Sequence, residues 1–305
     1  MPSTMTISRR TYRQNEGTGL SGDETVDVEN VGIPDQVISA ATEEQTALGA
    51  FKDHQLQTLC LKSDVDVEAQ FLGVRYPIVS LLVAAPDTIT YVGDVSEVIF
   101  PGDLIRLEGT VANDSIKRVA IVAAALITIE DGLPWTAAGG AAGTFSRVAS
   151  AQQTGYAYPV LALVALTGAI TYTGNVSDKF AAGDGLVLAG TAANDGYWVI
   201  DSVTFAAGVT TIIVLNEDGV VGLAANAGAV GTFQKMEPAF KLAANVPAQW
   251  TRTSGIQNPF ISPNVDTATG PLFNANRGDV SYCMVNNEGA VNANFAGRIG
   301  TNAIL

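Results

Sequence analysis

Short stretches in which apolar side chains occupy every second position recur along the chain, with turn-forming residues between them. This period is that of a half-buried β-strand. Such stretches cover residues 56–64, 65–72, 197–203, 211–215 and 280–286. The intervening Asn194-Asp195-Gly196 and Ala207-Gly208 are typical of tight turns, because Gly and Asn tolerate positive φ. The pattern predicts an all-β protein built from short strands.

An internal repeat divides the chain. The stretch Ile89-Thr90-Tyr91-Val92-Gly93-Asp94-Val95-Ser96 returns as Ile170-Thr171-Tyr172-Thr173-Gly174-Asn175-Val176-Ser177, at an offset of 170 − 89 = 81. Further on, Glu130-Asp131-Gly132 matches Glu217-Asp218-Gly219 at 217 − 130 = 87, and Gly143-Thr144-Phe145 matches Gly231-Thr232-Phe233 at 231 − 143 = 88. We therefore expect two copies of one module, with an insertion of about six or seven residues in a loop of the second copy, because surface loops tolerate insertions.

The repeat predicts the domain organisation. Residues 76–157 and 158–233 form two small β-barrel or β-sandwich modules. The flanks, 31–75 and 234–305, form the two halves of a discontinuous β-sandwich that the modules interrupt at an exposed hairpin. Residues 1–30 are polar and turn-rich, and they predict an extended N-terminal arm because they hold too little apolar surface to fold alone. Ser39 to Leu48 is expected to form either one short helix or a loop.

The two modules differ in the polarity of one face. Arg106 and Glu108 of the first copy are replaced by Val187 and Ala189 in the second. We therefore expect the second module to have a less polar outer face. Modules of about 70 residues bury only about 60% of their unfolded surface, so a homo-oligomer is the expected state.

Composition narrows the classes of function. The 305 residues include 16 Lys+Arg against 30 Asp+Glu, which gives a net charge of −14 without a basic run. Nucleic acid is therefore not an expected partner, because phosphate binding needs a concentrated positive field. The uncharged stretch 148–177 contains a purely apolar run of only 160–166, far shorter than the roughly 20 residues of a membrane-spanning helix. Arg9-Arg10 lies in a stretch like a twin-arginine signal, but no apolar segment follows it, so we expect neither a signal peptide nor a membrane partner.

Candidate catalytic residues are few. His54 is the only histidine, and no G-x-S-x-G elbow or phosphate loop accompanies it, so we predict no catalytic residue and no cofactor. Cys60 and Cys283 lie in apolar alternating segments and are interpreted as small buried hydrophobic residues, with a disulfide between them as the alternative. Arg277-Gly278-Asp279 matches the integrin-binding tripeptide, but it opens the expected strand 280–286 and is interpreted as a turn.

Carboxylates that recur in both modules raise the hypothesis of a calcium site. They are Asp103, Asp114, Glu130 and Asp131 in the first copy and Asp184, Asp195, Glu217 and Asp218 in the second. Calcium takes about six to eight oxygen ligands from closely spaced groups. The chain has no EF-hand spacing, and Asp beside Gly or Asn is ordinary in turns. We therefore predict turns at these positions and no metal site.

The repeats resemble small β modules of structural proteins in tailed bacteriophages. Their pattern is an apolar residue, a Gly-Asp turn, an alternating strand ending in Gly-Thr or Gly-Ser, and Asn-Asp-Gly before the next strand; it stands here at 180–197. The first copy departs from it, with Ser115 in place of the last Gly. The flanks resemble the β-sandwich of virion decoration-type proteins, on the residues Leu61 to Asp64, Phe240, Leu242, Ala244, Pro247, Trp250 and the strand ending near Asn286-Asn287. Together the resemblances cover most of residues 56–305.

The resemblance implies a non-enzymatic virion protein of a tailed phage. The expected role is that of a capsid decoration or cement protein, which binds the major capsid protein as a homo-oligomer, with a trimer among the candidate states. It would assemble in the host cytoplasm and reside in the virion. Arg9, Arg10 and Arg13 of the arm are the candidate interface residues for the shell.

Two other functions remain open. The first is a tail or fibre component whose modules bind glycans of the host surface, with Tyr172, Tyr197 and Trp198 as candidate stacking residues. Aromatic residues are also common in strand cores, which is the competing interpretation of these three. The second is a hydrolase that depends on His54.

Overall fold

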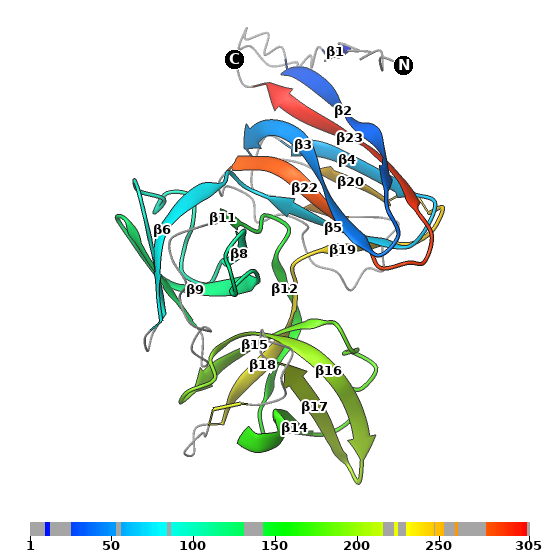
Figure 1. The fold of residues 1–305 in the computed structure, drawn as a ribbon. Coiled ribbons are helices and arrows are strands. Elements are labelled where there is room, and N and C mark those ends of the chain that lie inside the picture. Colours follow the sequence, from blue (N-terminus) through cyan, green and yellow to red (C-terminus); the bar gives the residue numbers. More distant parts are fainter. Residues whose placement is uncertain are drawn as a thin grey trace, which may run out of the picture. The chain divides into compact units, whose positions relative to one another are not determined.

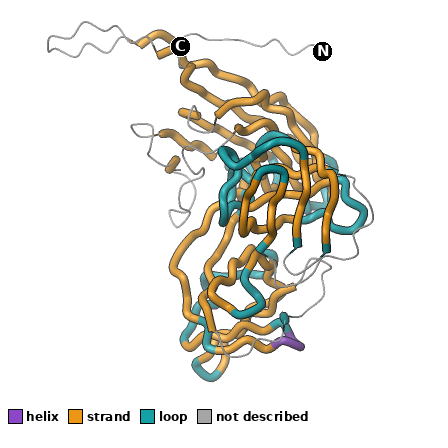
Figure 2. Tube along the Cα trace, turned by 90° about the vertical axis from the view of Figure 1, so that its left-hand side faces the viewer, coloured by secondary structure: helices purple, strands orange, loops and turns teal. Residues whose placement is uncertain are grey.

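The computed structural model describes residues 10–12, 26–52, 56–83, 87–130, 143–215, 223–224, 230–246, 248–252, 260–261 and 279–303. Nearly all of the regular secondary structure of these residues is β-strand, and the expectation of an all-β protein is confirmed. One short 3-10 helix, η2 (Ala165–Thr167), is also present and is purple in Figure 2. The chain divides into two compact units, one formed by residues 1–72 and 239–305 and the other by 73–238. We call them the flanking unit and the inserted unit.

The flanking unit contains two antiparallel sheets (Figure 1). The strands of its six-stranded sheet are, in spatial order, β1 (Arg10–Tyr12), β2 (Val26–Ile38), β23 (Ala293–Ala303), β4 (Leu56–Ser63), β20 (Ala248–Arg252) and β21 (Phe260–Ile261). Those of its four-stranded sheet are β19 (Phe240–Leu242), β5 (Val67–Leu72), β22 (Asp279–Asn287) and β3 (Thr42–Lys52). Each sheet joins strands from both sides of the inserted unit, since β23 pairs with β4 and β22 with β5.

The segment after β2 differs from the expectation. Residues 39–48 form neither a helix nor a long loop: a turn at 39–41 leads directly into β3, which belongs to the other sheet. The buried amide of Asn287 holds this crossing, because its Nδ2 donates to the carbonyl oxygens of Ile38 at 3.2 Å and Ser39 at 3.1 Å. In addition, residues 26–30, which the sequence assigns to the arm, open strand β2, in which residues 27–30 pair with β23.

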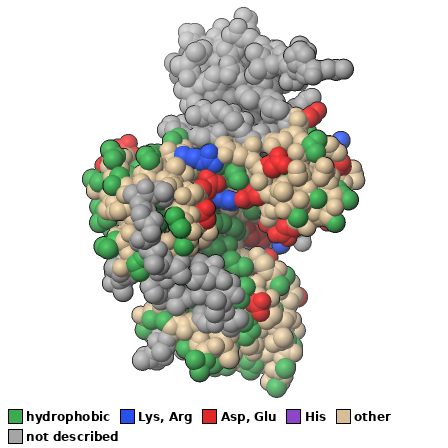
Figure 3. Space-filling view, in the orientation of Figure 1, with side chains coloured by type: hydrophobic (Ala, Val, Ile, Leu, Met, Phe, Trp, Pro, Cys, Tyr) green, Lys and Arg blue, Asp and Glu red, His purple; other side chains and the backbone are tan. Residues whose placement is uncertain are grey.

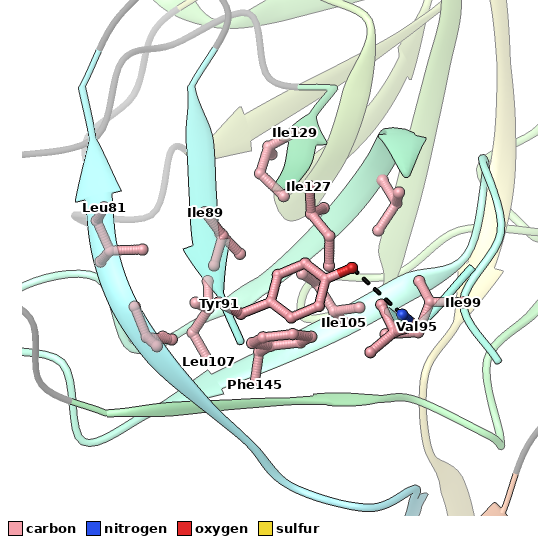
Figure 4. Packing of buried hydrophobic residues seen from close by; sticks show 12 residues of the cluster. Leu81, Ile89, Tyr91, Val95, Ile99, Ile105, Leu107, Ile127, Ile129 and Phe145 are labelled. Carbon is pink, nitrogen blue, oxygen red and sulfur yellow. Dashed lines mark hydrogen bonds between the residues drawn. The ribbon is translucent and has the colours of Figure 1, made fainter. Parts of the chain in front are cut away.

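The first repeat forms a closed barrel, which we call module 1. Its strands, in spatial order, are β10 (Leu126–Ile129), β7 (Thr88–Tyr91), β6 (Tyr76–Leu82), β11 (Thr144–Arg147), β8 (Leu104–Glu108) and β9 (Ile116–Ala123). Alternate residues of these strands point inward and pack into one core. The core consists of Ile78, Leu81, Ile89, Tyr91, Val95, Ile99, Ile105, Leu107, Val119, Ile127, Ile129 and Phe145 (Figure 4).

The second repeat, module 2, forms a seven-stranded sheet in which corresponding strands are neighbours. Its strand order is β12 (Gln152–Pro159), β18 (Val230–Glu237), β15 (Gly185–Thr191), β16 (Gly196–Ala206), β17 (Val209–Leu215), β14 (Ala169–Thr173) and β13 (Ala162–Val164). The first and last members of this order, β12 and β13, follow each other directly in the chain. They therefore correspond to β6 of module 1, broken at residues 160–161.

The insertion in module 2 does not lie only in a loop. The backbone amide of Val119 donates to the oxygen of Asp103, and the amide of Ile200 makes the equivalent bond to Asp184, so the two modules are related there by an offset of 81 residues. The amides of Ile129 and Val214 also make equivalent backbone bonds, but their offset is 214 − 129 = 85. Four added residues therefore lie between these points. The two hairpin tips follow Ala123 and Ala206, so each strand of the β16–β17 hairpin is two residues longer than in module 1. Figure 1 shows this long hairpin.

The structural register also corrects one sequence match. At offset 85, Glu130 corresponds to Leu215 and not to Glu217. Arg118, whose guanidinium contacts the Glu130 carboxylate at 2.6 Å, corresponds to Val199, which pairs with Leu215 in the sheet. An ion pair in module 1 is thus replaced by an apolar pair in module 2.

Candidate functional site

The recurrent Asp114 and Asp195 each hold one turn of their own module. Asp114 accepts hydrogen bonds from Gly109 N at 2.9 Å, Thr110 N at 2.6 Å and Thr110 Oγ1 at 2.6 Å. Asp195 accepts the same three bonds, from Gly190 N at 2.9 Å, Thr191 N at 2.6 Å and Thr191 Oγ1 at 2.7 Å. Hydrogen bonds of this kind fix a turn locally, because a short Asp side chain reaches back to nearby amides.

A second recurrent pair, Asp103 and Asp184, also holds turns. Phe100 N donates to Asp103 Oδ2 at 2.9 Å and Ala181 N to Asp184 Oδ2 at 2.8 Å. Asp184 lies 3.0 Å from Lys235 Nζ, which Glu237 contacts at 3.2 Å. Burial alone would lower the pKa of Lys235, but its hydrogen bond and charge interaction with Asp184, together with Glu237, raise that pKa above its usual value.

These carboxylates do not gather into a metal site. Among the residues that the structure describes, no three His, Cys, Asp or Glu side chains lie close enough to hold an ion. Asp131, Glu217 and Asp218 lie outside the described residues. The recurrence of Asp114 and Asp195 therefore has a structural explanation, which is the repeated turn.

A cluster of aromatic rings recurs in the two cores. In module 1, Tyr76 stacks on Phe145 with ring centroids 5.4 Å apart, and Tyr91 meets Phe145 edge-on at 5.4 Å. In module 2, Tyr158 stacks on Phe233 at 5.4 Å. The candidate residue Tyr172 belongs to this second cluster, since its ring meets Tyr158 edge-on at 5.3 Å and Phe233 at 6.0 Å.

The three candidate glycan-stacking residues do not form one platform. Trp198 is only 3% exposed, and its Nε1 donates to the backbone oxygen of Asn194 at 3.0 Å. Tyr197, the preceding residue of the strand, points to the opposite face. Its ring covers Gly185, where an added Cβ would lie 2.6 Å from Tyr197 Cε2. Trp198 thus belongs to the core, Tyr172 is partly buried against it, and Tyr197 packs against backbone.

Sequence reasoning did not single out Tyr156. This side chain is 67% exposed and its ring meets that of Tyr158 edge-on at 5.2 Å, so it is the exposed member of the aromatic cluster. The spacing Tyr156-Ala157-Tyr158 is the signal that could have found it, because residues two apart on a strand share a face.

Other sequence-based candidates lie mostly outside the described residues. These are Arg9, Arg13, His54 and Arg277-Gly278. Arg10 opens β1, where its backbone pairs opposite Val28. Asp279 is the first residue of β22, which therefore begins one residue before the expected strand 280–286, and it does not belong to the expected turn.

Cys283 is a buried free thiol, so the disulfide alternative is wrong. Its side chain has no exposed surface, and burial raises the pKa of the thiol well above its usual value. The interpretation of Cys283 as a small buried hydrophobic residue is confirmed.

The prediction of a less polar outer face on module 2 fails at Val187. That side chain is only 2% exposed, in a cross-strand pair with Tyr197. Arg106 and Glu108 of module 1 form an ion pair at 3.1 Å, and Arg75 contacts the same carboxylate at 2.8 Å. At this position the side chain of Arg106 forms an ion pair in module 1, whereas the side chain of Val187 is buried in module 2.

Comparisons with known proteins give no family. No protein-family model matches the chain, and no curated protein matches it either. Within the described ranges, the structure has no helix of the length and apolar character that crossing a membrane requires.

Proposed function

We propose that this chain is a non-enzymatic structural protein of a tailed-phage virion, a capsid decoration protein that binds the head shell as a homo-oligomer. The observation that carries the proposal is the duplicated β module, whose recurrent Asp114 and Asp195 are used by their own turns. Two copies of one module between the halves of a β unit suit a mechanical role. The resemblance of the repeats to phage β modules supports the assignment to a virion.

The proposed mechanism is stabilisation by linkage. A protein that binds only the assembled lattice shifts the equilibrium towards that lattice. Several contacts from one oligomer raise the strength of binding, because the second contact forms at a high effective concentration. In this proposal Arg9, Arg10 and Arg13 bind acidic groups of the major capsid protein.

Co-sedimentation of the full chain with purified capsids, and separately with purified tails, tests the proposal. We expect saturable binding to capsids at a copy number related to the shell symmetry. Binding to tails alone would refute the decoration role and favour the tail or fibre function.

Charge reversal of the arm tests the interface. Substitution of Arg9, Arg10 and Arg13 by Glu is expected to weaken capsid binding. The matched control reverses the same number of charges at Lys62, Lys179 and Lys241, which are exposed lysines elsewhere on the chain. Equal loss of binding in both variants would show a general charge effect and remove the arm from the mechanism.

A further inference from the structure

A short buried linker, residues 148–151, joins the last strand of module 1, β11, to the first strand of module 2, β12. The amide of Val148 donates to the oxygen of Leu104 at 2.8 Å, and the amide of Ala151 donates to the oxygen of Val148 at 3.3 Å. Residues 148–150 are buried. Linkers between independent modules are usually exposed and flexible. This linker is neither, so it restricts how the two modules move relative to each other.

The linker contains a residue that contacts its own counterpart in the other module. Phe145 corresponds to Phe233 at 233 − 145 = 88, and β11 and β18 carry this offset in their pairing with β8 and β15. At the same offset Ser150 corresponds to Pro238, since 238 − 150 = 88. The hydroxyl of Ser150 donates to the backbone oxygen of Pro238 at 2.6 Å, and Ser150 is only 1% exposed. Two equivalent positions of the repeat are thus bonded to each other.

A second contact also joins equivalent elements. Strand β9 of module 1 lies next to strand β16 of module 2. These strands are counterparts, because Val119 and Ile200 make equivalent backbone bonds at 200 − 119 = 81. When the same elements of two copies meet each other, the contact is isologous, as in a dimer about a two-fold axis. The two modules therefore pack like the two subunits of a dimer, within one chain.

We propose that module 1 and module 2 unfold together as one cooperative unit, because each stabilises the other through these contacts. Modules of about 70 residues bury too little surface to be more than marginally stable alone. Figure 3, in the orientation of Figure 1, shows hydrophobic side chains on the surfaces of both modules. A contact within one chain forms at a high effective concentration, so even a small one can stabilise both partners. The inference does not rest on the proposed function.

Amide hydrogen exchange of the full chain tests this coupling. The reporters are the amides of Val119 and Ile200, which are buried and make equivalent bonds. The matched variants are Asp114→Ala in module 1 and Asp195→Ala in module 2, which remove equivalent turn-fixing carboxylates. Each variant is expected to speed exchange about fivefold or more at both reporters, because a cooperative unit opens as a whole. Amides of β22 in the flanking unit should not respond.

Ser150→Ala tests whether the linker contact carries the coupling. This variant loses the bond to Pro238. In its background, each Asp variant should therefore have a smaller effect on the reporter of the other module. Ser115→Ala is the matched control, because it removes a hydroxyl bond to the oxygen of Asn113, at 3.2 Å, inside module 1. The effects of the Asp variants across the two modules should persist in that control background.

Three outcomes would overturn the inference. In the first, each Asp variant speeds exchange only at the reporter of its own module, so the modules are independent. In the second, the effects across the modules are the same in Ser150→Ala and Ser115→Ala, so the linker contact does not carry them. In the third, the amides of β22 respond equally, so the cooperative unit is the whole chain.

Urea unfolding of each variant shows whether it is folded. If Asp195→Ala does not fold, Thr210→Val replaces it as the module 2 variant, because it removes the hydroxyl that accepts from the Val176 amide. None of these measurements involves capsids. A protein that binds no capsid would thus refute the proposed function alone, whereas independent modules would refute this inference alone.

Discussion

The backbone amide of Val176 donates a hydrogen bond to Oγ1 of Thr210 at 3.1 Å. The equivalent amide of module 1, that of Val95, donates instead to the hydroxyl of Tyr91 at 3.3 Å (Figure 4). Thr210 lies in the lengthened part of the β16–β17 hairpin. The added residues thus supply the acceptor that the hydroxyl of Tyr91 supplies in module 1, although Tyr91 and its equivalent Tyr172 both pack in the aromatic cluster of their own module.

Thr210→Val is therefore expected to destabilise module 2 by about 1–3 kcal/mol, because it leaves the buried amide of Val176 and the carbonyl of Gly174 without the hydroxyl. Urea unfolding gives the free energy, and hydrogen exchange of the Val176 amide locates the effect. Thr211→Val, at the next and partly exposed position, is the control and should change the free energy of unfolding by less than about 0.5 kcal/mol. Equal costs at the two positions would contradict the role of Thr210.

Asp114→Ala and Asp195→Ala should have nearly equal effects, because the two carboxylates accept the same three hydrogen bonds. We expect each to cost about 1–2 kcal/mol, as for a lost helix cap or turn-fixing side chain. Denaturant unfolding of the full chain measures both.

The effect of calcium on the unfolding midpoint distinguishes a metal site at Asp114 and Asp195 from the turn explanation. Since the carboxylates are used by backbone and hydroxyl donors, addition of calcium or of a chelator should leave the wild-type unfolding midpoint unchanged. A midpoint that rises with calcium in the wild type but not in Asp195→Ala would show a metal site and contradict the turn explanation.

Several features could be predicted from sequence because they depend on local pattern. The alternation at 56–64 gives β4, and that at 211–215 gives most of β17. The Asp195 turn was recognisable because Asn-Asp-Gly favours the required backbone conformations. Such signals need no knowledge of what lies across the fold.

Other features depend on contacts distant in sequence. The turn at 39–41 is held by Asn287, about 250 residues away, so residues near 40 gave no local sign of it. Trp198 has an aromatic side chain suitable for stacking, but the core of module 2 buries it. Lys117, at the equivalent position of module 1, is also buried, with 1% exposure, which no periodicity rule would predict for a lysine.

Stability of the flanking unit should depend on the ionised form of Asp64. The side chain of Asn294, followed by its backbone amide, donates to this carboxylate and lowers its pKa below the usual value. A lowered pKa means that the carboxylate stabilises the fold above its unfolded-state pKa and that this contribution is lost as the pH falls through the native value. Asp64→Asn should thus be less stable than wild type at pH 7.

Urea midpoints of wild type and Asp64→Asn, measured from pH 7 downward, check this dependence. The difference between them should shrink as Asp64 of the wild type becomes protonated. Asp201→Asn, at an exposed position of module 2, is the control and should leave the midpoint unchanged. A difference between wild type and Asp64→Asn that stays constant with pH would mean that the carboxylate charge is not what holds Asn294.

Cys283 should resist alkylation in the native protein. Its thiol has no exposed surface and burial raises its pKa, so the reactive thiolate is scarce and shielded. Iodoacetamide at pH 8 should label the Cys283 peptide only after unfolding in urea, as read by mass spectrometry. The peptide that contains Cys60 is followed in the same digest. If unfolding without a reductant left both peptides unlabelled, the two cysteines would be linked, which would contradict the free thiol of the structure.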